Sequence, residues 1–205
     1  DALLAELRGM ANVTLRRSTQ ATGLYDHGYL LVRESLADHD PNAGIPRQRL
    51  WRLRAGHVIV ATGALERPLS FAGNDVPGVI LASAVRDYID NYGVAPGRRI
   101  VVVTNNDDAY RTALVALDAG LEVAVVIDAR STAEGALPAA VRARGVRVLT
   151  GSAVAGIKGG QAVEAVKICA HSGSGQVTET VDADCVAMSG GWSPVVHLWS
   201  HGGGK

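Results

Sequence analysis

The sequence predicts an α/β protein built around parallel strands, and three observations carry this prediction. Short apolar runs that end in small residues are typical of strands buried on both faces. Such runs alternate with helical segments between residues 98 and 149, which is the pattern of βαβ units. The 205 residues include 24 glycines and one phenylalanine, a composition typical of nucleotide-binding α/β folds.

The first part of the chain predicts a helix end and a small antiparallel sheet. Apolar residues at helical spacing predict the helix within residues 1–10. Strands are predicted at residues 13–15, 28–32 and 50–54. A strand buried on both faces is predicted over His57–Gly63, because a continuous apolar run ends there in small residues.

The middle of the chain predicts a second, Rossmann-like domain. A helix over residues 83–91 has Ser83 as its candidate N-cap and Gly93 close to its end. Two successive βαβ units should follow, with parallel strands and right-handed connections. Their expected elements are strands at 100–103, 122–127 and 146–149 and helices at 108–119 and 133–144. A β-meander over 153–181 and a buried strand over 184–188 complete the pattern.

Two buried strands that end in small residues flank this Rossmann-like domain. The first ends in Ala61-Thr62-Gly63 and the second in Ser189-Gly190-Gly191, where backbone could approach a ligand. We therefore expect one sheet to be interrupted by an inserted domain. The expected boundaries are residues 1–75 for the C-terminal part of a first dinucleotide-binding domain, 76–180 for the second domain and 181–205 for the return to the first.

The turn after the first strand of the second domain bears most directly on function. A dinucleotide-binding βαβ unit has G-x-G-x-x-G/A there, because glycine permits the tight turn and the approach of the pyrophosphate. This chain has Thr104 to Ala109 instead, and only Ala109 fits. Asp107 and Asp108 suit the positive end of a helix, so we expect one of them to cap it. This domain is predicted not to bind NAD, although Asp128 occupies the usual position of the ribose-binding acid.

Composition and the remaining residues exclude several other classes of function. Lysine and arginine total 20, as do aspartate and glutamate, so no basic surface for nucleic acid is expected. No secretory signal or apolar stretch of about 20 residues appears, which favours a cytoplasmic protein without a membrane span. Cys169 and Cys185 are expected to be buried thiols. His197 and His201 are not expected to form a metal site. Trp192 and Trp199 are expected to be packing residues and not a stacking platform. No catalytic or metal-binding residue is predicted.

Several motifs taken together resemble the alpha subunits of the heterotetrameric sarcosine oxidase family. They are Val58–Ala64, Glu66-Arg67-Pro68, Gly73-Asn74-Asp75, Pro77-Gly78-Val79, the degenerate turn Val102–Tyr110 and the closing Ser189–Pro194. Relatives of this family include opine oxidases, hydrogen cyanide synthase and dye-linked proline dehydrogenases. The resemblance implies a pyridine-nucleotide-disulfide-oxidoreductase-like fold, with a partial first dinucleotide-binding domain and an inserted Rossmann-like βαβ domain.

The resemblance also implies cofactors and partners. NAD would bind the first domain, FAD would lie on a beta subunit, FMN would lie at the alpha–beta interface, and tetrahydrofolate would bind a C-terminal domain outside this chain. Sarcosine would yield glycine, hydrogen peroxide, and formaldehyde or methylene-tetrahydrofolate, in a complex with beta, gamma and delta subunits. The expected cofactor contacts are Ala21, Ala61, Thr62 and Gly63, together with Gly190 and Gly191.

The chain begins without methionine and ends directly after a motif that normally leads onward, so we expect it to be an internal piece of a longer polypeptide. The glycine loop and ribose acid of the first domain would then precede Asp1, and this piece alone would bind NAD poorly. Two other functions remain open. One is an NAD(P)H-dependent flavin reductase whose loop tolerates substitution, and the other is a non-catalytic adaptor that docks a flavoprotein.

Overall fold

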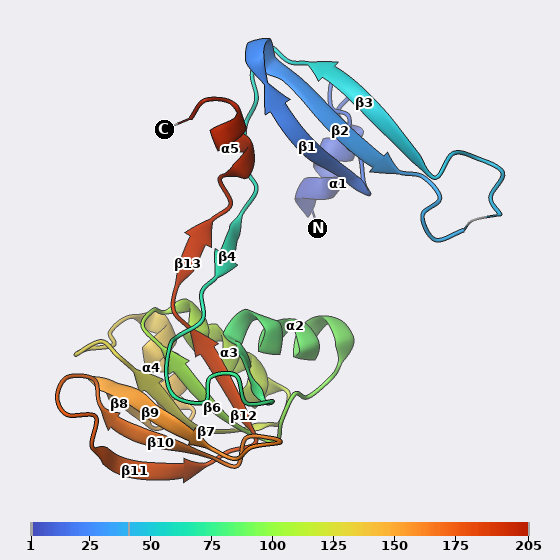
Figure 1. Ribbon diagram of the computed structural model, residues 1–205. Helices are drawn as coiled ribbons and strands as arrows, with labels where there is room; N and C mark the ends of the chain where they lie inside the picture. Colours follow the sequence, from blue (N-terminus) through green and yellow to red (C-terminus); the bar gives the residue numbers. More distant parts are fainter. Residues whose placement is uncertain (1, 41, 205) are drawn as a thin grey trace. The chain divides into compact units, whose positions relative to one another are not determined.

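The computed structural model describes residues 2–40 and 42–204, which form two compact units (Figure 1). The first unit combines the residues up to Gly63 with those from Pro194 onward, and the second unit is Ala64–Ser193. The second unit is therefore inserted into the sequence of the first.

The first unit contains an antiparallel sheet of three strands in the order β1-β2-β3. The strands are β1 (Thr19–Tyr25), β2 (Tyr29–Ser35) and β3 (Gln48–Arg54), and the helical segments are α1 (Ala2–Gly9), η1 (Asp26–Gly28) and α5 (His197–His201). The predicted helix end and two of the three predicted strands are confirmed. The predicted strand at residues 13–15 is wrong, because these residues join none of the described sheets and β1 begins only at Thr19.

The segment from His57 to Gly63 is not a strand, although its apolar run predicted one. Ile59 is 91% exposed, and Gly63 has a φ of 74°. An apolar run becomes a strand only where a neighbour supplies the ladder of hydrogen bonds. None of the described strands pairs with this segment, so the prediction of a buried strand is wrong for the described residues.

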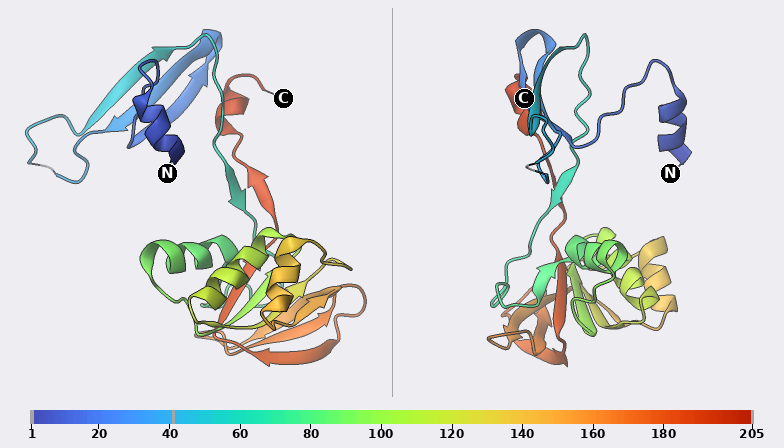
Figure 2. Two further views of the ribbon diagram at one scale, coloured as in Figure 1. Left: turned by 180° about the vertical axis from the view of Figure 1, so that it is seen from behind. Right: turned by 90° about the vertical axis from the view of Figure 1, so that its right-hand side faces the viewer.

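The second unit is built on a five-stranded parallel sheet with the order β5-β12-β6-β7-β8. Its strands are β5 (Val79–Leu81), β6 (Arg99–Thr104), β7 (Glu122–Asp128), β8 (Val148–Thr150) and β12 (Cys185–Ser189). Helices α2 (Ala82–Tyr92), α3 (Asp108–Asp118) and α4 (Ala136–Ala143) cover one face, and the meander β9 (Ser152–Lys158), β10 (Ala165–Ala170) and β11 (Val177–Asp182) covers the other (Figure 2). The predicted α/β class with parallel strands is confirmed.

Strand β6 explains why its sequence reads as a continuous apolar run. Ile100 and Val102 pack among the helices, whereas Val101 and Val103 pack toward the meander. All four side chains are almost completely buried. A strand covered on both faces needs apolar residues at every position, which removes the alternation seen in half-exposed strands.

The buried strand predicted over residues 184–188 exists as β12 but belongs to the second unit. It lies between β5 and β6 and pairs with both in parallel. Its residues alternate between the two apolar cores on either side of the sheet, so the strand is buried within the second unit. The inserted unit consequently runs from Ala64 to Ser193, which differs from the predicted span of 76–180.

Helix α2 ends as predicted and begins differently. Gly93 adopts a left-handed φ of 63° after its last turn, and its N–H donates to Ile89, which is a regular C-cap. Ser83 is not the N-cap, because the cap position is Leu81. The Ser83 N–H instead donates to the buried carboxylate of Glu66 at 2.8 Å.

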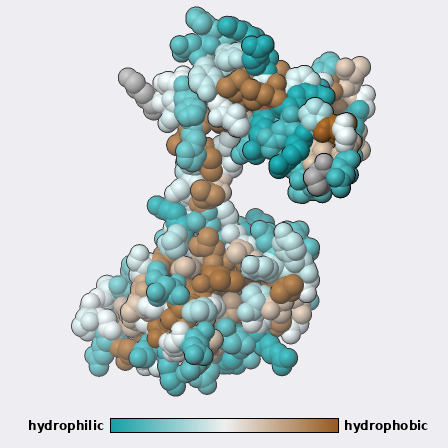
Figure 3. All heavy atoms as spheres, turned by 45° about the vertical axis from the view of Figure 1, so that its right-hand side comes forward, coloured by the Kyte–Doolittle hydropathy of each residue, from teal (hydrophilic) through white to brown (hydrophobic). Residues whose placement is uncertain are grey.

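A two-stranded sheet of β4 (Ala64–Glu66) and β13 (Trp192–Pro194) carries the chain into and out of the second unit. Leu65 on β4 is 64% exposed, and apolar residues lie along this ribbon in Figure 3. None of the helices in the described part of the chain has the length and apolar character required to cross a membrane.

Candidate functional site

The loop between β6 and α3 is closed by Asn106. Its side-chain oxygen accepts a hydrogen bond from the N–H of Asp108 at 3.0 Å, and its amide nitrogen donates to the hydroxyl of Ser189 at 3.0 Å. The hydroxyl of Thr104 accepts the N–H of Asn106 at 3.0 Å. The prediction that Asp107 or Asp108 caps α3 through its side chain is wrong, because Asn106 supplies the acceptor.

The two aspartates of this loop are paired with arginines. Arg86 on α2 forms an ion pair with Asp108 at 2.8 Å and also donates to the Asp108 carbonyl at 2.9 Å. Asp107 forms an ion pair of 2.8 Å with Arg130, which follows β7. The two carboxylates therefore lie at the positive end of α3, where a dinucleotide-binding domain would hold a phosphate, and each is bound by an arginine of the protein.

Asp128, the expected ribose-binding acid, is fully buried and bound by the protein itself. Tyr110 donates to it at 2.7 Å, and Arg130 donates through Nε at 3.0 Å and through Nη2 at 2.7 Å. Burial, and then the hydrogen bond to Asp128, raise the pKa of Tyr110. The hydrogen bond to Asp128 is the largest cause of a raised pKa at Arg130. This arrangement leaves Asp128 occupied by its own neighbours.

The loop between β6 and α3 lies where a ligand of this type of sheet would bind. Strand β6 lies between β7 and β12, and ligands of open α/β sheets bind in the crevice outside the carboxyl ends of such strands. Asn105 and Asn106 reach across it to Gly190 and Ser189. Side chains of this loop therefore bridge the carboxyl ends of β6 and β12.

Gly190 and Gly191, expected to approach a cofactor, lie in the second unit beside Arg67. A Cβ atom on Gly190 would lie 2.8 Å from the carbonyl oxygen of Pro68 and 3.0 Å from that of Arg67. The backbone of Gly190 donates to Arg67 at 2.7 Å, and Arg67 donates back to Gly191 at 2.8 Å. Gly190 therefore permits a close approach within the protein.

In the first unit, the structure brings Ala21 and Thr62 to one cavity of about 650 Å³. The cavity is lined by β1 residues 19–22, by Thr62, and by residues of α5 and its approach. A second cavity of about 300 Å³ is lined by Ala61, Thr62 and Gly63 together with Trp199 and the chain before it. These cavities unite the four cofactor contacts that the sequence predicted for the first unit.

The turn at Thr62 is fixed to the returning chain. The hydroxyl of Thr62 donates to the carbonyl of Val195, and the N–H of Val195 donates to Gly63 at 3.0 Å. Thr62 and Val195 line both cavities. The chain that leads to α5 is thereby part of the same site.

Sequence reasoning did not assign the residues of α5 to a site. His197 and His201 line the larger cavity, and Trp199 lines the smaller one with 53% of its surface exposed. The sequence did offer one signal for this site. His197 and His201 are four residues apart, which places them on one face of a helix, and Trp199 is two residues from each, which places its indole on another face. The glycine-rich sequence that follows concealed that signal.

Both cysteines are buried and free, as predicted. Burial, with a smaller effect from Asp184, raises the pKa of Cys185 to about 12. Cys169 lies on β10, where its sulfur is 3.7 Å from the carbonyl oxygen of Ala153. Within residues 2–40 and 42–204, no group of three or more metal-ligating side chains is assembled.

Comparison with known proteins agrees with this architecture. Residues 11–204 match the sequence profile of the pyridine nucleotide-disulphide oxidoreductases. The chain is 42% identical to sarcosine oxidase subunit alpha of Rhizobium meliloti (strain 1021), over 98% of its own length and 20% of the relative. It is 43% identical to the subunit of the same name from Corynebacterium sp. (strain P-1), over 100% of its length and 22% of the relative.

The chain thus spans about a fifth of the length of these curated relatives. Among solved structures, T. acidophilum thioredoxin reductase superposes with a TM-score of 0.70 at 16% identity, covering 100% of this chain and 62% of that protein. This likeness concerns the fold. The expected fold class and the resemblance to sarcosine oxidase alpha subunits are both confirmed.

Proposed function

The chain belongs to the pyridine nucleotide-disulphide oxidoreductase family, and from this premise we propose that it is the NAD-holding part of the alpha subunit of a sarcosine oxidase. One contrast carries the proposal. The dinucleotide loop of the second unit is filled by the protein's own side chains, whereas the first unit keeps a cavity of about 650 Å³ lined by Ala21 and Thr62. NAD would therefore bind the first unit and not the second.

The residues of the first unit suit the binding of a cofactor by backbone and small side chains. Ala21, Ala61 and Gly63 leave space beside the cavities, and Thr62 holds the turn to Val195. The flavins, FAD on a beta subunit and FMN at the alpha–beta interface, would supply the electron-accepting chemistry. The part of this chain would be to bind and orient NAD and to support the interface.

The loop between β6 and α3 of the second unit supports a role other than that of an NAD(P)H-dependent reductase. A reductase that takes hydride from NAD(P)H needs an open phosphate loop, and a disulfide reductase also needs a reactive cysteine pair. Asp107 and Asp108 place negative charge at the start of α3, and Cys185 is buried with a raised pKa. Entry of hydride through the second unit is therefore disfavoured.

The complete enzyme would demethylate sarcosine to glycine, with formaldehyde or methylene-tetrahydrofolate and hydrogen peroxide as further products. Beta, gamma and delta subunits would be its partners, and tetrahydrofolate would bind another part of the polypeptide. High identity to two sarcosine oxidase alpha subunits over nearly the whole chain supports this choice of substrate.

The test is reconstitution of the full natural polypeptide that carries this sequence. We expect sarcosine-dependent hydrogen peroxide when the beta, gamma and delta subunits are added, and none without beta. Oxidation of NADH by the alpha polypeptide with free flavin would favour a flavin reductase instead. Assembly with beta but no turnover of sarcosine or another secondary amine would favour a non-catalytic adaptor.

A further inference from the structure

We propose that α5 is the element of the first unit that recognises the dinucleotide, with His197 and His201 binding ribose hydroxyls and Trp199 stacking on a planar base. This inference rests on the proposed NAD site and names the residues that would give it specificity. It assigns a binding role to residues that sequence reasoning treated as structural.

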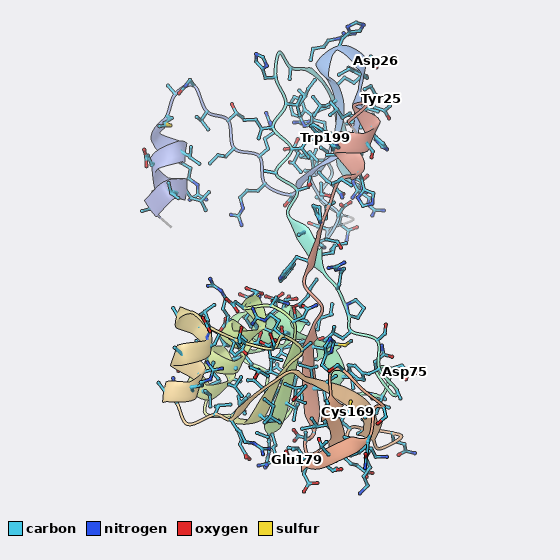
Figure 4. The ribbon with its side chains drawn as sticks, turned by 90° about the vertical axis from the view of Figure 1, so that its left-hand side faces the viewer. Tyr25, Asp26, Asp75, Cys169, Glu179 and Trp199 are labelled. Carbon is cyan, nitrogen blue, oxygen red and sulfur yellow. The ribbon has the colours of Figure 1, made fainter. Side chains whose placement is uncertain are left out.

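The histidines and the tryptophan of α5 lie on different faces of this helix. His197 and His201 are four residues apart, so they share one face of the helix and line the larger cavity. Trp199 lies between them in sequence, on another face, and lines the smaller cavity. Figure 4 labels Trp199 on this helix. The helix therefore presents imidazoles to one cavity and an indole to the other.

The two cavities adjoin one another. Thr62 and Val195 contribute to the walls of both, and their mutual hydrogen bond fixes that shared wall. A dinucleotide has a polar ribose and pyrophosphate region beside planar bases. The larger cavity, of about 650 Å³, suits the sugar region, and the smaller, of about 300 Å³, suits a base.

Most other polar side chains of the larger cavity are already engaged. The hydroxyl of Thr19 donates to Arg17 at 2.7 Å, and that of Thr22 donates to Leu31 at 3.2 Å. Gln20 accepts a hydrogen bond from Arg33 at 3.3 Å.

The two histidines differ from these groups. No side-chain hydrogen bond of either imidazole is formed within the described part of the chain, and the ring of His201 lies 6.5 Å from that of Tyr25. A neutral imidazole donates one hydrogen bond and accepts another, which matches a ribose hydroxyl that does both. His197 and His201 are therefore the side chains of this cavity that remain available to a sugar.

Trp199 differs from the other tryptophan of the first unit. Trp51 lies under the guanidinium of Arg16 at 4.2 Å and donates its indole N–H to Glu34 at 2.7 Å. Trp199 is 53% exposed at the wall of a cavity, although Gly204 packs beside its indole nitrogen. The exposed part of an indole ring at a cavity offers a stacking surface of the kind that a nucleotide base requires.

The experiment is calorimetric titration of the full natural polypeptide, assembled with its partner subunits, with NAD and with ADP-ribose. We expect His197→Ala and His201→Ala each to weaken NAD binding about 5-fold, and the double variant about 20-fold or more. ADP-ribose should show the same losses, because it retains both sugars. His39→Ala, an exposed histidine of the same unit that lines neither cavity, should bind as the wild type does.

Trp199 is tested by two substitutions. Trp199→Leu should weaken NAD binding about 10-fold, whereas Trp199→Phe should stay within about 3-fold because it keeps an aromatic face. Quenching of intrinsic fluorescence by NAD should be smaller in Trp199→Phe than in the wild type, and this readout does not depend on enzyme activity. Thermal unfolding shows whether each variant remains folded.

The two levels of the proposal separate in these data. A wild-type polypeptide that binds no NAD would overturn the proposed NAD site itself. Wild-type binding with unchanged affinity in both the double histidine variant and Trp199→Leu would overturn only the assignment to α5.

Discussion

The phenol of Tyr110 donates a hydrogen bond of 2.7 Å to the carboxylate of Asp128, and both side chains are excluded from solvent. This contact joins α3 to the end of β7 at the position where a dinucleotide-binding domain would hold a ribose. Arg130 completes the arrangement by binding Asp128 and Asp107 together. A site that ordinarily serves a ligand is here part of the folded core.

Removal of the Tyr110 hydroxyl should therefore destabilise the protein. Tyr110→Phe leaves Asp128 with one donor fewer in a buried setting, and we expect a loss of about 1–2 kcal/mol in the free energy of unfolding. Urea unfolding measures it. Asp118→Asn is the control, since its ion pair with Arg144 is exposed and should change stability by less than about 1 kcal/mol. Equal effects of the two variants would contradict the buried role.

Restoring glycines to the loop should not restore a dinucleotide site. Thr104→Gly with Asn106→Gly recreates two glycine positions but leaves Asp107 and Asp108 at the start of α3. We expect no NADH binding to the second unit and a lower melting temperature, because the Asn106 cap and its bond to Ser189 are lost. Crystals soaked with NADH would show the outcome, and density for a dinucleotide over this loop would refute the explanation.

Gly190 should be intolerant of any side chain. Gly190→Ala places a Cβ atom 2.8 Å from the carbonyl oxygen of Pro68, a backbone atom that cannot move without displacing the chain. We expect a loss of about 1–3 kcal/mol in the free energy of unfolding, as for overpacked sites. Gly160→Ala is the matched control, since its added methyl would meet nothing within 4 Å. The control should unfold at the wild-type temperature within about 2 °C.

Cys185 should make the protein sensitive to alkaline pH. Its pKa is raised from 9.0 to about 12 by burial, so its contribution to stability is complete below pH 9 and is lost as pH rises through the folded pKa. Between those values the loss should approach about 1.4 kcal/mol per pH unit. Unfolding between pH 8 and 11 measures this slope, which Cys185→Ala should reduce. An identical slope in that variant would show that other groups dominate.

The sequence predicted those elements whose signals are local. The apolar run of β6 and the left-handed turn at Gly93 depend on residues within a few positions, and both are confirmed. The assignment of β12 to the first domain was wrong because its partner β5 has only three residues, Val79–Leu81, and gives little signal of its own. Strand pairing across about 100 residues is a tertiary fact that periodicity does not contain.

Local features of the candidate sites could likewise be predicted from the sequence, whereas contacts between distant residues could not. The departure of Thr104–Ala109 from the glycine pattern was visible in the sequence, and the structure supplies the side chains that fill the loop. Arg86 and Arg130 were not predicted, because each lies 22 or 23 residues from the aspartate that it meets. The approach of α5 to β1 was also unforeseen, since it joins residues near opposite ends of the chain.

The ribbon of β4 and β13 has a consequence for engineering. Both ends of the inserted unit, Ala64 and Ser193, belong to this one pair of strands, so the entry and exit of the chain are neighbours. A short linker could join them, and new termini could open at the exposed turn Ser172–Gly175. The second unit is thus suited to circular permutation, and the first could accept a graft of a different domain at the same two positions.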